Sequence, residues 1–168
     1  MVKINTKKKK LTSSMEDYLE AIAAIKAEKG VARVKDISKM MGVKKPSVTS
    51  AVKSLCERGL IIHERYGYVD LTRQGEKLAR SIRRKHDTLV RFISRILGVD
   101  RKIAAADACK IEHHISPETF ERLTKFVEFV KGCPDGDKPE WLKGFDHYHR
   151  TGKRLECKTR KRTKKRKR

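Results

Sequence analysis

The segment from residue 34 to residue 71 restricts the fold more than any other part of this chain. Two short amphipathic segments meet there at Gly42-Val43, and Pro46 falls in the first turn of the second segment, where a missing N–H costs little. Two runs typical of strands follow, at 60–64 and 68–71, with a turn between them. Preceded by a further helix, this order predicts a winged helix-turn-helix.

Apolar spacing predicts which helix faces are buried. The first helix begins at Ser13, where Glu16 three residues later completes a capping box, and it ends before Gly30. The second runs over 34–41 and the third to about Arg58. Side chains expected to point inward recur at helical spacing in all three. They are Leu19, Ile22, Ala23 and Ile25, then Ile37, Met40 and Met41, then Val48, Ala51, Val52 and Leu55.

The second half of the chain also has helical patterns. Thr72 caps a long helix over about 73–97, Asp100 caps another, and Ser116-Pro117 begins a third. Beyond Cys133 no regular element is expected, since prolines and glycines interrupt any pattern there.

The formal net charge of +22 indicates a polyanionic partner. Nine of the eleven residues in 158–168 are basic, and +13 remains without them. An acidic membrane surface is a weaker alternative to nucleic acid, because no basic amphipathic helix has a strong aromatic face. The predicted strands also lack the aromatic stripe of an RNA-recognition sheet. Double-stranded DNA is therefore the expected partner.

A winged helix-turn-helix inserts the second helix of its pair into the major groove. The outward face of that helix combines lysines, which suit phosphates, with short hydroxyl side chains, which suit base edges. The candidate DNA-binding residues are Lys44, Lys45, Ser47, Thr49, Ser50 and Lys53, with Arg65 and Tyr66 at the tip of the wing. The alternative is a three-helix core with a solvated polar face.

Three side chains suited to a transition metal lie within one turn of a later helix. Cys109, Glu112 and His113 occupy positions i, i+3 and i+4, which are neighbours on a helix surface. Possible partners on other helices are Asp17, Glu20 and His86. Each group alone has a plainer explanation: a solvated helix face, acidic residues that favour a helix N-terminus, or a surface histidine. A metal site therefore requires that the three helices converge.

Four motifs follow one another in a specific order. They are Ser14-Met15-Glu16-Asp17-Tyr18-Leu19-Glu20, the segment 34–71, Arg84-Lys85-His86, and Ile111-Glu112-His113-His114-Ile115-Ser116. Together they resemble the diphtheria toxin repressor family, and more closely its manganese transport regulator branch, over about residues 12–131. The resemblance implies a metal-activated transcriptional repressor that binds a palindromic operator as a homodimer and controls metal homeostasis. The ligand positions that it implies are Asp17, Glu20, His86, Glu112 and His113.

Cys109 departs from the manganese branch, which usually carries a carboxylate at this position. A cysteine here resembles the iron-responsive branch, yet that branch has a methionine in place of Asp17. Its ancillary metal site also needs polar ligands where this chain has Val90 and Ala105. Oxygen-rich sites suit Mn²⁺, whereas a thiolate shifts the preference towards Fe²⁺, Co²⁺, Ni²⁺ or Zn²⁺. We expect Fe²⁺ or Mn²⁺, with Fe²⁺ slightly favoured.

Residue patterns and resemblance together predict a mostly α-helical chain. An N-terminal winged helix-turn-helix is followed by a helical metal-binding and dimerisation domain. The expected divisions are a disordered basic arm (1–11), the DNA-binding domain (12–72), the metal-binding and dimerisation domain (73–132), a C-terminal extension (133–157) and a disordered basic tail (158–168).

The C-terminal extension offers a second set of ligands. Two cysteines and two histidines suit tetrahedral Zn²⁺, although their spacing matches no known zinc motif. They are Cys133, His147, His149 and Cys157. The alternative is a loop whose Trp141 and Phe145 pack on the dimerisation helices.

Two other functions compete with that of a metal-activated repressor. A metal-independent architectural DNA-binding protein would be equally basic, but metal would not change its affinity for DNA. A metalloenzyme is disfavoured, because there is no His-Glu-x-x-His pairing and six ligands would fill an octahedral site. With neither a signal peptide nor an apolar run of about 18 residues, we expect a cytoplasmic protein with free or metal-bound thiols.

Overall fold

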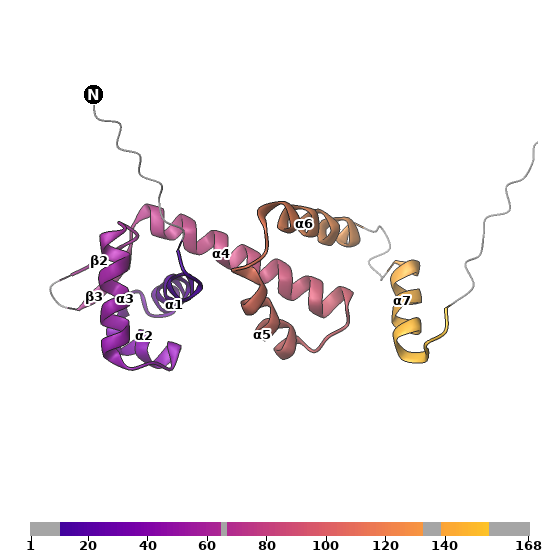
Figure 1. Cartoon of the computed structure of the whole chain (residues 1–168), viewed down its shortest axis with the longest axis horizontal. Coiled ribbons are helices and arrows are strands. Elements are labelled where there is room, and N and C mark those ends of the chain that lie inside the picture. The colour runs from indigo at the N-terminus through magenta and orange to yellow at the C-terminus, as the bar shows by residue number, and fades with distance from the viewer. Residues whose placement is uncertain (1–10, 65–66, 133–138, 155–168) are drawn as a thin grey trace, which may run out of the picture.

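The computed structural model describes residues 11–64, 67–132 and 139–154. Its helices are α1 (Ser13–Lys29), α2 (Val34–Met41), α3 (Lys45–Glu57), α4 (Arg73–Arg91), η1 (Phe92–Ile96), α5 (Arg101–Glu112), α6 (Pro117–Lys131) and α7 (Glu140–Thr151). Its strands are β1 (Ala32–Arg33), β2 (Ile61–His63) and β3 (Tyr68–Leu71). The first three helices and the strands form an N-terminal head, from which α4 runs towards α5 and α6, with α7 beyond them (Figure 1).

The start of α1 differs from the predicted capping box. Thr12, not Ser13, is the N-cap, and its hydroxyl accepts a hydrogen bond from the Met15 amide at 3.4 Å. Glu16 donates its amide to the Thr12 carbonyl, but its carboxylate turns away from the helix terminus. The helix therefore starts where predicted, and Glu16 is left for another role.

The head has the winged helix-turn-helix arrangement that the sequence predicts. Gly42 ends α2 in the left-handed region (φ 65°), which lets the chain turn directly into α3. The sheet has the order β1-β3-β2 with antiparallel pairs, Ala32 opposite Val69 and Ile61 opposite Leu71. Strand β1 was not predicted, because two residues are too few to show an alternating pattern.

The predicted apolar stripes form the core of the head. Fully or almost fully buried are Leu19, Ile22, Ile25, Ile37, Val48, Ala51, Val52 and Leu55. The prediction was wrong for Met40, which is 49% exposed. Ile37 and Met41, four residues apart, pack on the core, whereas Met40 is rotated about 100° from Met41 around the helix axis.

Helix α4 packs against both α1 and α5 and so joins the head to the second half of the chain. Thr72 caps it by accepting a hydrogen bond from the Gly75 amide. The predicted continuation to residue 97 is present as the π-helical turn η1, in which the Leu97 amide donates to the Phe92 carbonyl. Asp100 and Ser116 cap α5 and α6 as predicted.

The expectation of no regular structure after Cys133 was wrong for residues 140–151, which form α7. Leu142 is buried with Ile96 and Val127, and the Trp141 ring lies 6.0 Å from that of Phe126. This packing on α6 holds a helix whose own sequence, with a central glycine, predicts none. None of the helices among the described residues is long and apolar enough to span a membrane.

Candidate metal centre

Four of the six predicted metal ligands converge where α1 meets α5. They are Asp17, Cys109, Glu112 and His113, each of which offers one ligand atom, and these atoms lie within 4.8 Å of one another. Asp17 comes from the first turns of α1, the other three from the last turn and the C-cap of α5. The head and the second half of the chain thus contribute to one cluster.

The His113 imidazole lies at the centre of this cluster, with its side chain only 5% exposed. Its Nε2 is 2.9 Å from Asp17 Oδ1 and 3.5 Å from Glu112 Oε1. Its Nδ1 is 2.7 Å from Oε2 of Glu16. Burial by itself lowers the pKa of His113, but the hydrogen bond to Glu16 and the charges of Asp17 and Glu112 outweigh it, and the pKa is raised.

Glu112 is a fully buried carboxylate. Its Oε2 accepts a hydrogen bond from His86 Nδ1 at 2.9 Å, whereas Oε1 has no hydrogen-bond partner among the described residues. Burial raises the pKa of Glu112 to about 7; the charge of His113 opposes this shift and that of Asp17 adds to it. A buried oxygen without a partner is costly, and a cation would satisfy it.

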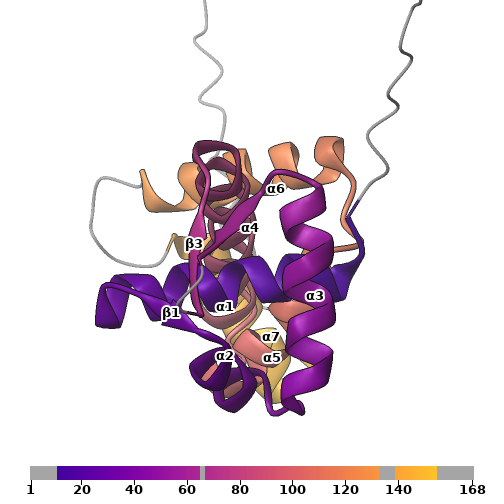
Figure 2. The same cartoon turned by 90° about the vertical axis from the view of Figure 1, so that its left-hand side faces the viewer.

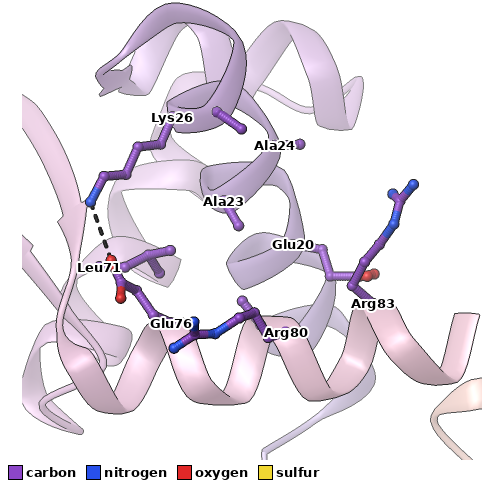
Figure 3. Close-up of a pocket in the computed structure, with 10 residues that line it drawn as sticks. Glu20, Ala23, Ala24, Lys26, Leu71, Glu76, Arg80 and Arg83 are labelled. Atoms are coloured by element: carbon purple, nitrogen blue, oxygen red, sulfur yellow. Dashed lines mark hydrogen bonds and ion pairs between the residues drawn. The ribbon is translucent and has the colours of Figure 1, made fainter.

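Glu20 and His86, the other two predicted ligands, lie beside the cluster. His86 on α4 contacts it through Glu112. Glu20 lines a groove of about 700 Å³ between α1 and α4, where it lies near Arg83 (Figure 3). Burial, followed by the charge of Glu112, raises the pKa of Glu20 to about 7. Both residues are therefore adjacent to the cluster but outside its group of close ligand atoms.

At the other end of this groove, ion pairs hold α1 in place. Lys26 Nζ pairs with Asp70 of β3. It also lies 3.5 Å from Glu76 of α4, as the dashed line in Figure 3 marks. Between the two ends the groove is lined mainly by alanines and Leu71. The helix that carries Asp17 is thus attached to the wing strand and to α4 at once.

The residues of the cluster fit a divalent transition metal. Carboxylates, an imidazole and a thiol are suitable ligands, and the unpartnered Glu112 oxygen lies among them. The pKa of the Cys109 thiol is raised, first by removal of solvent and then by the charges of Glu112, Asp17 and Glu20. A cation would reverse this effect, because it favours the thiolate.

The candidate DNA-binding side chains of α3 are all exposed. They are Lys44, Lys45, Ser47, Thr49, Ser50 and Lys53. Helix α3 lies on the outer side of the head, in front of α1 in the view of Figure 2, and its buried stripe faces inward. Arg65 and Tyr66, predicted at the wing tip, lie outside the described residues.

The structure describes only half of the possible zinc set. His147 and His149 lie on α7, whereas Cys133 and Cys157 are outside the described residues. Helical residues two apart do not face each other, so the two histidines are poorly placed to share one ion. The His149 ring instead stacks on Phe145 of the same helix, with 6.4 Å between the ring centroids.

Sequence reasoning missed Glu16, whose carboxylate contacts the candidate ligand His113. A signal was available, because Glu16 is four residues before Glu20 and so lies on nearly the same face of α1. The predicted capping box gave Glu16 another partner and so concealed this relation.

Two family models match this chain, one over its N-terminal part and one over its C-terminal part. Residues 10–69 match the family described as iron dependent repressor, N-terminal DNA binding domain. Residues 72–140 match iron dependent repressor, metal binding and dimerisation domain. The two matches meet at the start of α4.

Two individual transcriptional regulators are also similar in sequence to this chain. The HTH-type transcriptional regulator MntR of Lysinibacillus sphaericus is 38% identical over 124 residues, which are 74% of this chain and 88% of that protein. MntR of Bacillus pumilus is 39% identical over 120 residues, 71% of this chain and 83% of that protein.

Two solved structures resemble the fold. The manganese regulator SloR matches with a TM-score of 0.63 and 31% identity, over 76% of this chain and 60% of that one. The T. acidophilum protein IdeR matches with a TM-score of 0.62 and 30% identity, over 79% of this chain and 61% of that one. The present chain thus spans about three fifths of the length of these two structures.

Proposed function

Because this chain belongs to the iron-dependent repressor family, we propose that it is a metal-activated transcriptional repressor that binds operator DNA as a homodimer. The observation that carries the proposal is the convergence of Asp17 of the head with Cys109, Glu112 and His113 of α5.

The cluster joins the DNA-binding part of the chain to the part that matches a dimerisation domain. Without a cation, Asp17, Glu20 and Glu112 crowd together, and repulsion between those that are ionised favours separation of α1 from α5. With a divalent cation bound, the same side chains hold α1 against α5. The cation therefore shifts the population towards one orientation of the head.

A fixed orientation matters because a homodimer presents two copies of α3. A palindromic operator has half-sites about one helical turn apart, and both copies must enter the major groove together. The exposed lysines of α3 suit phosphates and its hydroxyl side chains suit base edges. Arg65 and Tyr66 are proposed to contact DNA beside these half-sites.

The cation is proposed to be Fe²⁺ or Mn²⁺, and the regulated process metal homeostasis. Two of the matched relatives carry the name MntR, and SloR is described as a manganese regulator. The carboxylates of this cluster suit Mn²⁺, while Cys109 adds a thiolate that favours Fe²⁺ and later metals. Zn²⁺, Co²⁺ and Ni²⁺ are expected to bind in vitro as well.

The test is operator binding by the purified metal-free protein, titrated anaerobically with Fe²⁺, Mn²⁺ and Zn²⁺ on a DNA fragment selected from random sequence. We expect at least one metal to raise the affinity about 5–150-fold, the usual range of allosteric coupling, and a chelator to reverse the gain. Equal affinity with and without chelator would instead identify a metal-independent architectural DNA-binding protein.

A further inference from the structure

Glu16 makes a contact that the set of metal ligands does not explain. Its Oε2 lies 2.7 Å from Nδ1 of His113, the ring nitrogen that does not face Asp17. The side chains of Glu16 and His113 are only 13% and 5% exposed. This hydrogen bond is therefore largely shielded from solvent and joins α1 to the end of α5.

Glu16 and Asp17 are consecutive on α1 and hold the two nitrogens of one ring. Asp17 Oδ1 lies 2.9 Å from Nε2, and Glu112 Oε1 lies 3.5 Å from the same nitrogen. Nε2 thus faces the candidate ligand atoms, whereas Nδ1 faces a residue outside that group. The two nitrogens of the ring therefore have different neighbours.

A neutral imidazole has one N–H and one lone pair, and only the lone pair can bind a metal. A carboxylate beside Nδ1 accepts a hydrogen bond from an N–H at that position, which leaves the lone pair on Nε2. We propose that Glu16 is a positioning residue that fixes the tautomer and orientation of His113, so that Nε2 is available to a divalent cation. This inference rests on the proposed function.

Helix capping does not account for the position of the Glu16 side chain. Thr12 caps α1 with its own hydroxyl, and the carboxylate of Glu16 is directed to His113 instead. Histidine ligands in metal sites almost always donate their second N–H to a carboxylate, carbonyl or water, and losing that partner typically costs 10–100-fold in metal affinity. A cation at Nε2 would replace the contact of that nitrogen with Asp17, and Glu16 would keep its contact with Nδ1.

The first experiment measures Co²⁺ affinity of the full chain by competition with a metal-binding dye. Glu16→Ala removes the acceptor and is expected to weaken binding about 10–100-fold; Glu16→Gln, which keeps an acceptor oxygen without the charge, should lose less. Glu28→Ala is the matched control, an exposed glutamate on the same helix. Equal affinity of Glu16→Ala and Glu28→Ala overturns the inference, provided that wild type binds Co²⁺.

The second experiment needs no variant and so remains decisive if Glu16→Ala fails to fold. Histidine side-chain ¹⁵N shifts of the wild-type protein are recorded with Zn²⁺. We expect His113 to bind the metal through Nε2 and to keep a proton on Nδ1; coordination through Nδ1 overturns the inference. A wild-type protein that binds neither Co²⁺ nor Zn²⁺ contradicts the proposed function itself.

Discussion

At the scale of single residues, the unusual feature is a fully buried carboxylate among the candidate metal ligands. Glu112 is fully buried, and only one of its oxygens accepts a hydrogen bond from the described residues. A buried carboxylate is costly when charged, so Glu112 keeps its proton up to near-neutral pH in the metal-free protein. A cation bound by this cluster would remove the cost of burying the charged carboxylate.

The raised pKa values of the buried groups predict that the metal-free protein loses stability as the pH rises. The pKa of Glu112 and that of Glu20 are raised from 4.5 to about 7 in the folded protein. Between these values the folded state binds protons that the unfolded state has lost, so the free energy of unfolding falls with increasing pH. The raised pKa of His113 acts in the same direction, because its protonated form is the one favoured by folding.

Urea unfolding with a chelator present, at intervals from about pH 4.5 to about pH 7.5, measures this effect. The midpoint is expected to fall across the range for wild type and to fall less for Glu112→Gln, which cannot ionise. A midpoint that rises over the same interval for wild type contradicts the assignment.

Replacement of the thiol tests metal preference. Cys109→Glu adds a hard oxygen ligand, so it is expected to raise the potency of Mn²⁺ relative to Fe²⁺ in promoting operator binding. The measurement is the concentration of each metal needed for half-maximal binding under anaerobic conditions. If Mn²⁺ activates wild type and Cys109→Glu equally well and Fe²⁺ activates neither, the preference for iron is wrong.

Local spacing predicted part of the cluster and could not predict the rest. Cys109, Glu112 and His113 meet because one helical turn joins them, so sequence alone reveals their proximity. Which of the α1 carboxylates reaches them depends on how α1 rotates against α5. Asp17 joins the three ligand atoms of α5, whereas Glu20 faces the neighbouring groove and Glu16 contacts His113.

At the scale of elements, the start of α4 is packed against the sheet without space for a side chain. A Cβ at Gly75 would overlap the carbonyl oxygen of Leu60, which itself accepts hydrogen bonds from the amide and hydroxyl of Thr72. Backbone on both sides cannot move aside easily. Position 75 therefore requires glycine because the Leu60 backbone lies so close to it, and not because of the dihedral angles of Gly75.

Gly75→Ala is accordingly expected to destabilise the protein by about 1–3 kcal/mol, the usual cost of overpacking. Gly144→Ala is the control, because a Cβ there meets nothing within 4 Å and alanine favours the interior of α7. Urea unfolding of both variants decides the comparison. A Gly75→Ala protein as stable as Gly144→Ala would contradict the close contact.

The helices with clear caps and stripes were predictable, and two other elements were not. Strand β1 has two residues and exists only because β3 pairs with it. Helix α7 contains Gly144, and its apolar residues gain their partners on α6 and η1. Both elements depend on contacts between residues far apart in the sequence, and a local sequence pattern carries no information about such contacts.

At the scale of the whole molecule, we expect the basic tail and the DNA-binding helix to contribute differently: the tail to overall affinity for DNA, and the helix to sequence preference. The segment 158–168 carries nine basic residues and lies outside the described part of the chain. We expect its deletion to flatten the dependence of log affinity on log salt, by about 0.9 for each phosphate that the segment neutralises, while the preference for one operator sequence remains. Titrations at several salt concentrations on specific and scrambled DNA measure both quantities. A change in sequence preference would contradict this division of roles.

His113 contacts Glu16 and Asp17, which lie 97 and 96 positions before it in the sequence. Contacts of such separation require closure of a long loop, so they are expected to form after the local structure of the head. A cation held between α1 and α5 needs both helices in place, so it would stabilise the native state more than the folding transition state. Metal should therefore prolong the lifetime of the folded protein while its rate of folding stays nearly constant.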